Sequence, residues 1–435
     1  MKSKITIQSQ TMYRLTSLPN GLRVATATLP EMAGVSLGLW VGTGSRYEPA
    51  ELNGACHFIE HMLFKGTQRR SAREISEAVE GLGGYLNAFT SEEHTCFHAR
   101  VHHRHFSDVL EVLLDMMLGS RFAPADVAKE REVIKEEIAM YRDQPAQHVQ
   151  EILNALTWPG QPLGRSITGS ARSLNRIGRR ELLGVLATHY RAANTVLAVA
   201  GPLSHDTVLR AVRPVVNRFT AGPAPTFAPA NARQTGPRVR LVAQDTEQAQ
   251  LALGIRTCSR HDERRFALRL LNALLGENMS SRLFQRIRED LGLAYNIYSG
   301  LSFYADVGDL VISAGLDVEQ LPRVVRLIRR ELRRCAEETV SAAELRRARD
   351  FAIGQMDLSL ESTENQMNLL GEQLLGYGRI VPPAVTKRRL AAVTAAEVRR
   401  VAADFFRPDR LNLAVVCAGR PGRPLAGELA GLLGR

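Results

Sequence analysis

Hydrophobic and polar positions along the chain follow two different periods. Apolar residues alternate or run together over 21–27, 35–41 and 194–201, which is typical of strands. The stretches 83–90 and 93–101 indicate two further strands joined by a short turn. Longer stretches between these runs repeat their apolar residues every three to four positions, which is the period of a helix with one buried face. The pattern predicts an α+β fold with antiparallel-rich sheets covered by helices.

The stretch 54–66 predicts a short helix with one apolar and one polar face. On a helix that turns about 100° per residue, His57, Glu60 and His61 project from the same side. We expect Asn53 to cap the start of this helix and the glycine at the end of the stretch to terminate it. Two imidazoles at positions i and i+4 can each direct a ring nitrogen at one cation, and zinc accepts such ligands.

A second predicted helix, over 126–141, carries two glutamates within its apolar stripe. Glu130 and Glu137 fall on the apolar side, whereas Glu132 and Glu136 fall on the solvent side. A carboxylate on an apolar face is costly unless a cation or hydrogen bonds compensate it. A metal ion shared with the histidine helix would supply that compensation. Without such a third ligand, the histidine pattern alone is equally typical of an ordinary solvated helix face.

Both stretches resemble one family. His57, Glu60 and His61 form the order H-x-x-E-H, and the run from Glu130 to Glu137 reads E-R-E-V-I-K-E-E. The two motifs are similar to those of the pitrilysin-type zinc peptidases, the inverzincins, and most similar to the branch of the mitochondrial processing peptidase catalytic subunit. The resemblance implies one Zn²⁺ per chain, held by His57, His61 and Glu137. It also implies that Glu60 is the general base and that Glu130 orients a ligand.

Two other stretches resemble regions of that family that meet the substrate. The strand containing L-N-A-F-T makes Asn87 and Ala88 candidate contacts to the backbone of an extended substrate. The region from S-S-R-L-F to G-L-A-Y makes Arg288 and Tyr295 candidates for contact with the substrate or the tetrahedral intermediate. For the second pair, a surface arginine and a packed tyrosine remain the alternative.

The chain contains two related halves. The sequence G-S-R-Y-E at 44–48 is echoed by C-S-R-H-D at 258–262. Continuing this alignment places Leu271, Leu274 and Leu275 opposite the metal motif, so we expect no metal in the second half. The resulting organisation has three parts: a catalytic zinc-binding α+β domain over 1–219, a Pro/Ala-rich linker over 220–237, and a homologous substrate-contacting α+β domain over 238–435.

Composition and charge exclude several classes of protein. The net charge of +11 lies mainly on amphipathic helices such as 323–334, so solvated helix faces account for it and we expect no nucleic-acid binding. The five cysteines are scattered without C-x-x-C spacing, which argues against a disulfide framework. We interpret the histidines over 94–105 as a half-exposed sheet face, not as a second metal site.

No membrane association is expected either. No apolar run reaches the roughly 20 residues that span a bilayer, and residues 1–10 hold no apolar leader segment. We therefore expect a cytoplasmic protein.

Together these features predict a zinc endopeptidase acting on extended peptides or unfolded polypeptide segments. Single-chain pitrilysins join four such α+β units into a closing shell, whereas this chain has two, so the resemblance implies a partner chain. Because the chain carries both the metal residues and Arg288 with Tyr295, we expect a homodimer in which this pair acts on the partner's metal. A heterodimer with a related subunit is the alternative. The alternative function is a non-catalytic core subunit of a larger assembly.

Overall fold

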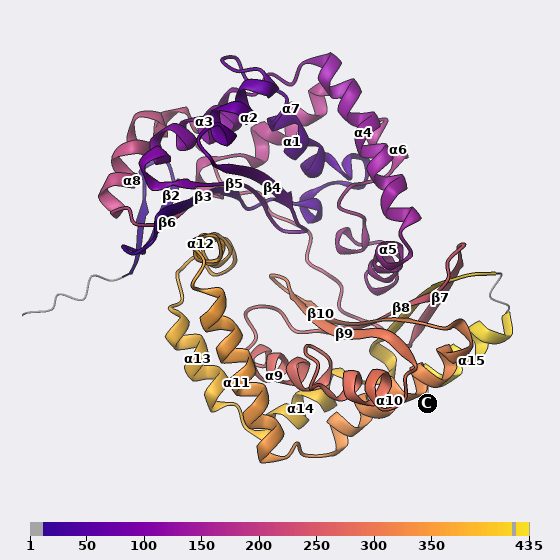
Figure 1. Cartoon of the computed structure of the whole chain (residues 1–435). Helices are drawn as coiled ribbons and strands as arrows, with labels where there is room; N and C mark the ends of the chain where they lie inside the picture. Colours follow the sequence, from indigo (N-terminus) through magenta and orange to yellow (C-terminus); the bar gives the residue numbers. More distant parts are fainter. Residues whose placement is uncertain (1–11, 420–422, 435) are drawn as a thin grey trace, which may run out of the picture.

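The computed structural model describes residues 12–419 and 423–434. Residues 1–10, in which we expect no apolar leader segment, lie outside the described part. Two β-sheets face each other, and each is covered by helices on its outer side (Figure 1). Among the described residues, no helix combines the length and apolar character needed to cross a membrane.

The first sheet has six strands in the order β1-β2-β6-β3-β5-β4. Strands β2 and β6 are parallel, and the other neighbouring pairs are antiparallel. All five strands expected in this half are present, and β1 is an addition. The strands are β1 Tyr13–Ser17, β2 Arg23–Thr28, β3 Gly34–Val41, β4 Tyr85–Thr90, β5 Thr95–His102 and β6 Thr195–Gly201. Its helices are α1 Ala55–Leu63, α2 Ala72–Glu80, α3 Phe106–Gly119, α4 Pro124–Asp143, α6 Ala171–Leu174, α7 Arg179–His189 and α8 His205–Val212.

The second sheet repeats this arrangement. Its order β7-β11-β8-β10-β9 matches β2-β6-β3-β5-β4, and its one parallel pair, β7 with β11, corresponds to β2 with β6. The expectation of two related, antiparallel-rich α+β units is therefore confirmed. The strands are β7 Arg238–Ala243, β8 Ala249–Thr257, β9 Ala294–Phe303, β10 Gly308–Leu316 and β11 Leu411–Cys417. Its helices are α9 Arg265–Leu275, α10 Leu321–Glu337, α11 Ala342–Ser359, α13 Pro383–Ala392, α14 Ala395–Phe405 and α15 Arg423–Gly434.

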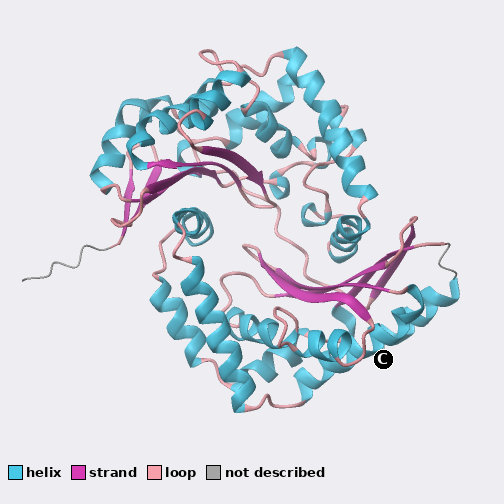
Figure 2. Cartoon of the chain, in the orientation of Figure 1, coloured by secondary structure: helices cyan, strands magenta, loops and turns pink. Residues whose placement is uncertain are grey.

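The two halves exchange one helix each. Helix α5, Pro145–Thr157, leaves the first half and packs on β8 and β11 of the second sheet. Helix α12, Thr363–Tyr377, makes the reverse exchange and packs on β2, β3 and β6, on the inner face of the first sheet (Figure 2). The buried contacts join Met367, Leu370 and Leu374 to Trp40, Val196 and Ala198, and Val149, Ile152 and Leu153 to Ala252, Ala414 and Val416. The packing of these two helices therefore holds the halves together in addition to the linker. The bounds 220–237 for the linker remain a prediction.

Candidate active site

Helix α1, which carries the histidine motif, is anchored by a buried carboxylate. Glu48 accepts hydrogen bonds from the backbone N–H groups of Gly54 at 2.8 Å and Cys56 at 2.7 Å, and from the Asn53 side chain at 3.0 Å. These N–H groups lack partners within the helix, and a negative charge complements the positive end of the helix dipole. Burial raises the pKa of Glu48, although the hydrogen bonds oppose that shift.

The expectation that Asn53 caps this helix is wrong. Gly54 holds the N-cap position with φ 99°, and no side chain caps it from that position. A positive φ favours glycine, and the capping acceptor comes from Glu48, farther back in the chain than local capping rules reach. Gly66, just beyond the end of α1, has φ 109°, the left-handed conformation expected there.

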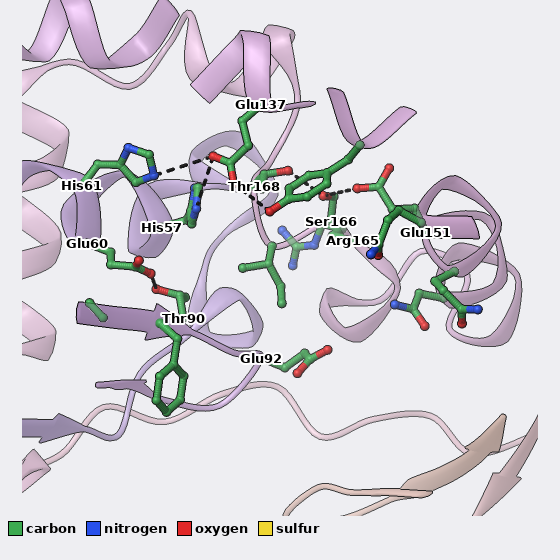
Figure 3. Close-up of a pocket in the computed structure, with 17 residues that line it drawn as sticks. His57, Glu60, His61, Thr90, Glu92, Glu137, Glu151, Arg165, Ser166 and Thr168 are labelled. Atoms are coloured by element: carbon green, nitrogen blue, oxygen red, sulfur yellow. Dashed lines mark hydrogen bonds and ion pairs between the residues drawn. The ribbon is translucent and has the colours of Figure 1, made fainter. Parts of the chain in front are cut away.

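Three side chains converge between α1 and α4. The Nε2 atoms of His57 and His61 each lie 3.6 Å from Oε2 of Glu137. One ligand atom from each residue lies within 4.8 Å of the others. Figure 3 shows the two imidazoles and the carboxylate pointing toward one another from the two helices. Within the described ranges this is the only such His, Cys, Asp and Glu cluster suited to a metal, and the histidines over 94–105 form none.

An unpaired buried carboxylate oxygen at this cluster indicates a cation. Oε2 of Glu137 is buried and has no hydrogen-bond partner among the described residues. A buried carboxylate oxygen facing two ring nitrogens is costly unless a positive charge lies between them. Burial, with a smaller contribution from His61, lowers the pKa of His57 to about 3, which keeps this imidazole neutral and able to ligate. Two histidines and one glutamate are a donor set of catalytic zinc sites, so the residues fit zinc.

Neighbouring side chains fix the orientation of two of these groups. The Tyr141 hydroxyl donates to Oε1 of Glu137 at 2.9 Å, which leaves Oε2 for the cluster. Glu130, 2% exposed, lies 3.2 Å from Nδ1 of His61 and 2.9 Å from Nζ of Lys65. A carboxylate at Nδ1 holds the ring so that Nε2 faces the metal position. Glu130 therefore lies beside His61, and its orienting role stays a prediction.

Glu60 lies beside the three converging residues. The Thr90 hydroxyl, at the end of β4, donates to Oε2 of Glu60 at 2.5 Å (Figure 3). Burial raises the pKa of Glu60, and the hydrogen bond from Thr90 opposes the shift. A carboxylate with a raised pKa is a better proton acceptor than an ordinary surface glutamate.

A cavity of about 490 Å³ opens beside these side chains, between α1, α4, α5 and β4. Among the described strands, β4 is the outer one of its sheet and pairs only with β5, so one of its backbone edges has no strand partner. Ala88 lines the cavity, whereas Asn87 is exposed and its amide donates to the Tyr85 hydroxyl at 2.6 Å. The free edge can pair with an extended peptide.

Comparison with known proteins identifies the family. The family model described as insulinase (peptidase family M16) matches residues 23–171, and the model described as peptidase M16 inactive domain matches 176–351. An uncharacterized zinc protease of Streptomyces coelicolor is 39% identical over 399 residues, with 90% of this chain and 87% of the relative covered. The chain belongs to peptidase family M16. The resemblance inferred from the two motifs is thereby confirmed.

Other M16 proteins agree with this assignment. A probable mitochondrial-processing peptidase subunit beta of Arabidopsis thaliana is 34% identical, with 90% of this chain and 76% of that protein covered. A protease from Helicobacter pylori superposes with a TM-score of 0.87 at 21% identity, covering 93% of this chain and 99% of that one. At this identity the superposition shows the shared fold.

The second M16 unit contributes nothing to the described cavity. Arg288 lies with its guanidinium 4.7 Å from the Phe284 ring centroid, and Tyr295 is 72% exposed. Neither residue lines the cavity beside His57. In α9, the counterpart of α1, all three residues aligned with the metal motif are buried in the core: Leu271, Leu274 and Leu275.

Four residues near the site were missed in the sequence. Tyr141 follows Glu137 by four positions on one helix, so i,i+4 spacing could have identified it. Lys65 contacts Glu130 on the other helix, so spacing along its own helix does not signal it. Thr90 and Glu48 act across separate elements, and no local pattern signals their contacts.

Proposed function

We propose that this chain is a zinc endopeptidase that cleaves extended peptides or unfolded polypeptide segments. The observation that carries the proposal is the convergence of His57, His61 and Glu137 around a position that requires a cation, with Glu60 beside it. Membership of family M16 and the names of relatives as zinc proteases support it.

His57, His61 and Glu137 hold one zinc ion. When bound, zinc acts as a Lewis acid that polarises the substrate carbonyl and lowers the pKa of a water molecule. Glu130 keeps the His61 ring in place through Nδ1, and Tyr141 does the same for the Glu137 carboxylate.

Glu60 carries the proton during the reaction. Its carboxylate accepts a proton from the water that attacks the peptide carbonyl and returns that proton to the leaving amine. The substrate lies as an additional strand against the free edge of β4, where Ala88 and Asn87 are the candidate backbone contacts. A substrate in this position must be extended, which favours unfolded segments over folded domains.

The chain acts as a homodimer in which Arg288 and Tyr295 of one chain complete the site of the other. Their exposure and their distance from the cavity of their own chain support this arrangement. A related subunit could take the partner's place, since one relative is named as a subunit beta of a processing peptidase.

Three single substitutions test the roles of the glutamates. Glu60→Gln should retain zinc and lose peptide cleavage, because the amide cannot accept the proton. Glu137→Gln should lose zinc itself. Glu136→Gln, exposed on the same helix, is the control and should change neither property. Normal cleavage by the Glu60→Gln variant would refute the mechanism.

A further inference from the structure

The Glu60 carboxylate is in contact with Thr90. Among the described residues, the hydrogen bond from the Thr90 hydroxyl is the only one that the Glu60 side chain makes. Thr90 ends β4, and its position therefore depends on what fixes the turn between β4 and β5. That turn, residues 91–94, is held by contacts from the segment after β3 and from the second half of the chain.

Four charged side chains form an ion cluster at the junction of the halves: Arg46, Glu93, Arg260 and Asp306. Nη1 of Arg46 donates to Glu93 at 2.6 Å, and its Nη2 donates to Asp306 at the same distance. Arg260 donates to the other carboxylate oxygen of Glu93. The backbone N–H of Ala305 also donates to Glu93, at 3.0 Å. Glu93 in the turn is thus bound by three groups, two of them from the second half.

The ion cluster is balanced in charge and buried at its centre. The side chain of Arg46 is 1% exposed and that of Glu93 is 8% exposed, whereas Arg260 and Asp306 lie at the edge with 17% and 29% exposed. Two guanidinium groups face two carboxylates, so each charge has a partner. Removing one member of such a cluster leaves an uncompensated buried charge. The second half therefore adds two contacts, from Arg260 and Ala305, to a turn that Ser45 and Arg46 of the first half also hold.

The linker closes the ion cluster from a third side. The Phe227 ring centroid lies 3.9 Å from the guanidinium carbon of Arg46, a cation–π contact. The backbone N–H of Ala230 donates to Asp306 at 2.7 Å. The backbone N–H of Arg46 in turn donates to the carbonyl of Glu92, at 2.9 Å, which attaches the turn to the segment after β3.

We propose that Thr90 is a positioning residue for Glu60 and that the ion cluster holds Thr90 in place. The inference rests on the proposed function, in which Glu60 is the base. The proposal gives the second half, which lacks the metal motif, a role in its own chain. Arg260 and Asp306 of that half help to fix the turn that follows β4. The fixed turn holds Thr90, and Thr90 holds the Glu60 carboxylate. A base held in one orientation meets the attacking water in a reactive geometry more often than a freely rotating one.

Thr90→Val tests the first step, because it keeps the side-chain shape and removes the donor. We expect kcat to fall roughly 10- to 100-fold while KM stays within about twofold. Zinc content should equal that of the wild type. Thr90→Ser restores a hydroxyl and should recover most of kcat. A Thr90→Val enzyme at the wild-type rate, or a Thr90→Ser enzyme as slow as Thr90→Val, would overturn the proposal.

Thr95→Val is the matched control. Thr95 lies directly opposite Thr90 on β5, and its hydroxyl donates to the carbonyl of Thr43 at 3.0 Å. The substitution removes a threonine hydroxyl at the same level of the sheet without touching Glu60. We expect kcat to stay at the wild-type value. An equal loss of kcat in both valine variants would show a general effect of the sheet and overturn the specific role of Thr90.

Asp306→Asn tests the second step, because it keeps an acceptor for Ala230 but removes the charge that faces Arg46. We expect a several-fold lower kcat with zinc retained. The double variant Thr90→Val/Asp306→Asn should be no slower than Thr90→Val alone, because both changes act on one contact. Losses that multiply would show that the ion cluster acts by another route. Glu344→Gln, which breaks the partly buried pair with Arg282, is the control and should leave kcat unchanged.

The outcomes separate this inference from the proposed function. If Glu60→Gln abolishes cleavage and Thr90→Val does not slow it, the base assignment stands and the positioning role is wrong. If Glu60→Gln cleaves normally, the assigned base is wrong, and the positioning role falls with it.

Discussion

At the scale of single residues, burial separates the candidate site carboxylates of helix α4 from the solvent-exposed ones. On helix α4, Glu130 is buried and Glu137 is partly buried, whereas Glu132 and Glu136 are exposed. The helical period predicted this division, and the cost of burying a carboxylate gave it a chemical meaning. The same reasoning leads to a quantitative expectation for Glu130. This residue contacts His61 but does not face the metal position.

Glu130→Gln should weaken zinc binding without removing a proposed ligand. The amide is a poorer acceptor for the Nδ1 proton of His61, and Lys65 loses its counter-charge. Loss of such an outer partner lowers metal affinity roughly 10- to 100-fold. Competition with a coloured chelator measures the dissociation constant. Glu132→Gln, at an exposed position of the same helix, should leave it unchanged; an unchanged constant in Glu130→Gln as well would contradict the orienting role.

The sequence predicted the site only as far as single helices determine it. His57, His61 and Glu137 project from faces that the helical period defines, so their convergence could be anticipated once the family motif was recognised. The contact from Thr90 to Glu60 could not, because it depends on how β4 lies across α1. The contacts of Glu48 could not be predicted for the same reason. Its carboxylate reaches the start of α1 only because the chain between residue 48 and the helix folds back on itself.

At the scale of elements, local periodicity predicts a helix or strand but not the surface it covers. The five strands predicted in the first half correspond to β2 to β6 within a few residues. By contrast, nothing in the sequence of α5 or α12 indicates that each packs on the sheet of the other half. An apolar face shows only that a helix is buried. The exchange must therefore be tested on the residues that make the contact.

Gly371→Ala should destabilise the protein through the exchanged helix α12. A Cβ atom there would lie 2.3 Å from the Trp40 ring, which is fully buried in the first half. Forcing a methyl group into such a contact costs about 1–3 kcal/mol. Urea denaturation measures the free energy of unfolding.

Gly354→Ala on helix α11 is the matched control. A Cβ atom at this position meets nothing within 4 Å. The alanine should therefore raise stability by about 0.5–1 kcal/mol through helix propensity alone. Equal effects of the two substitutions would contradict the packing of α12 against Trp40.

At the scale of the whole molecule, the two α+β units share one architecture but differ at the position of the metal motif. The strand orders of the two sheets match, yet the second copy carries buried leucines where the first carries the metal motif. Arg288 and Tyr295 in that copy lie away from the only described metal cluster. A second chain that brings these residues to the metal would account for their exposure.

Two inactive variants should regain activity when mixed. One variant carries Glu60→Gln, and the other carries Arg288→Ala with Tyr295→Phe. After subunit exchange, a mixed dimer has one site with every group intact. Half of the dimers are mixed and each has one such site, so cleavage should return to on the order of one quarter of the wild-type rate. Demonstrated exchange without activity would contradict the homodimer.

The central claim is that one zinc ion, held by His57, His61 and Glu137, makes this chain a peptidase. The most direct measurement removes metal with a chelator and then follows zinc content and cleavage of an unstructured peptide as zinc is added back. The account predicts no cleavage without zinc and a rate that rises in proportion to bound zinc until one ion per chain is reached. Cleavage by the zinc-free chain, or a fully loaded chain that cleaves nothing, would contradict it.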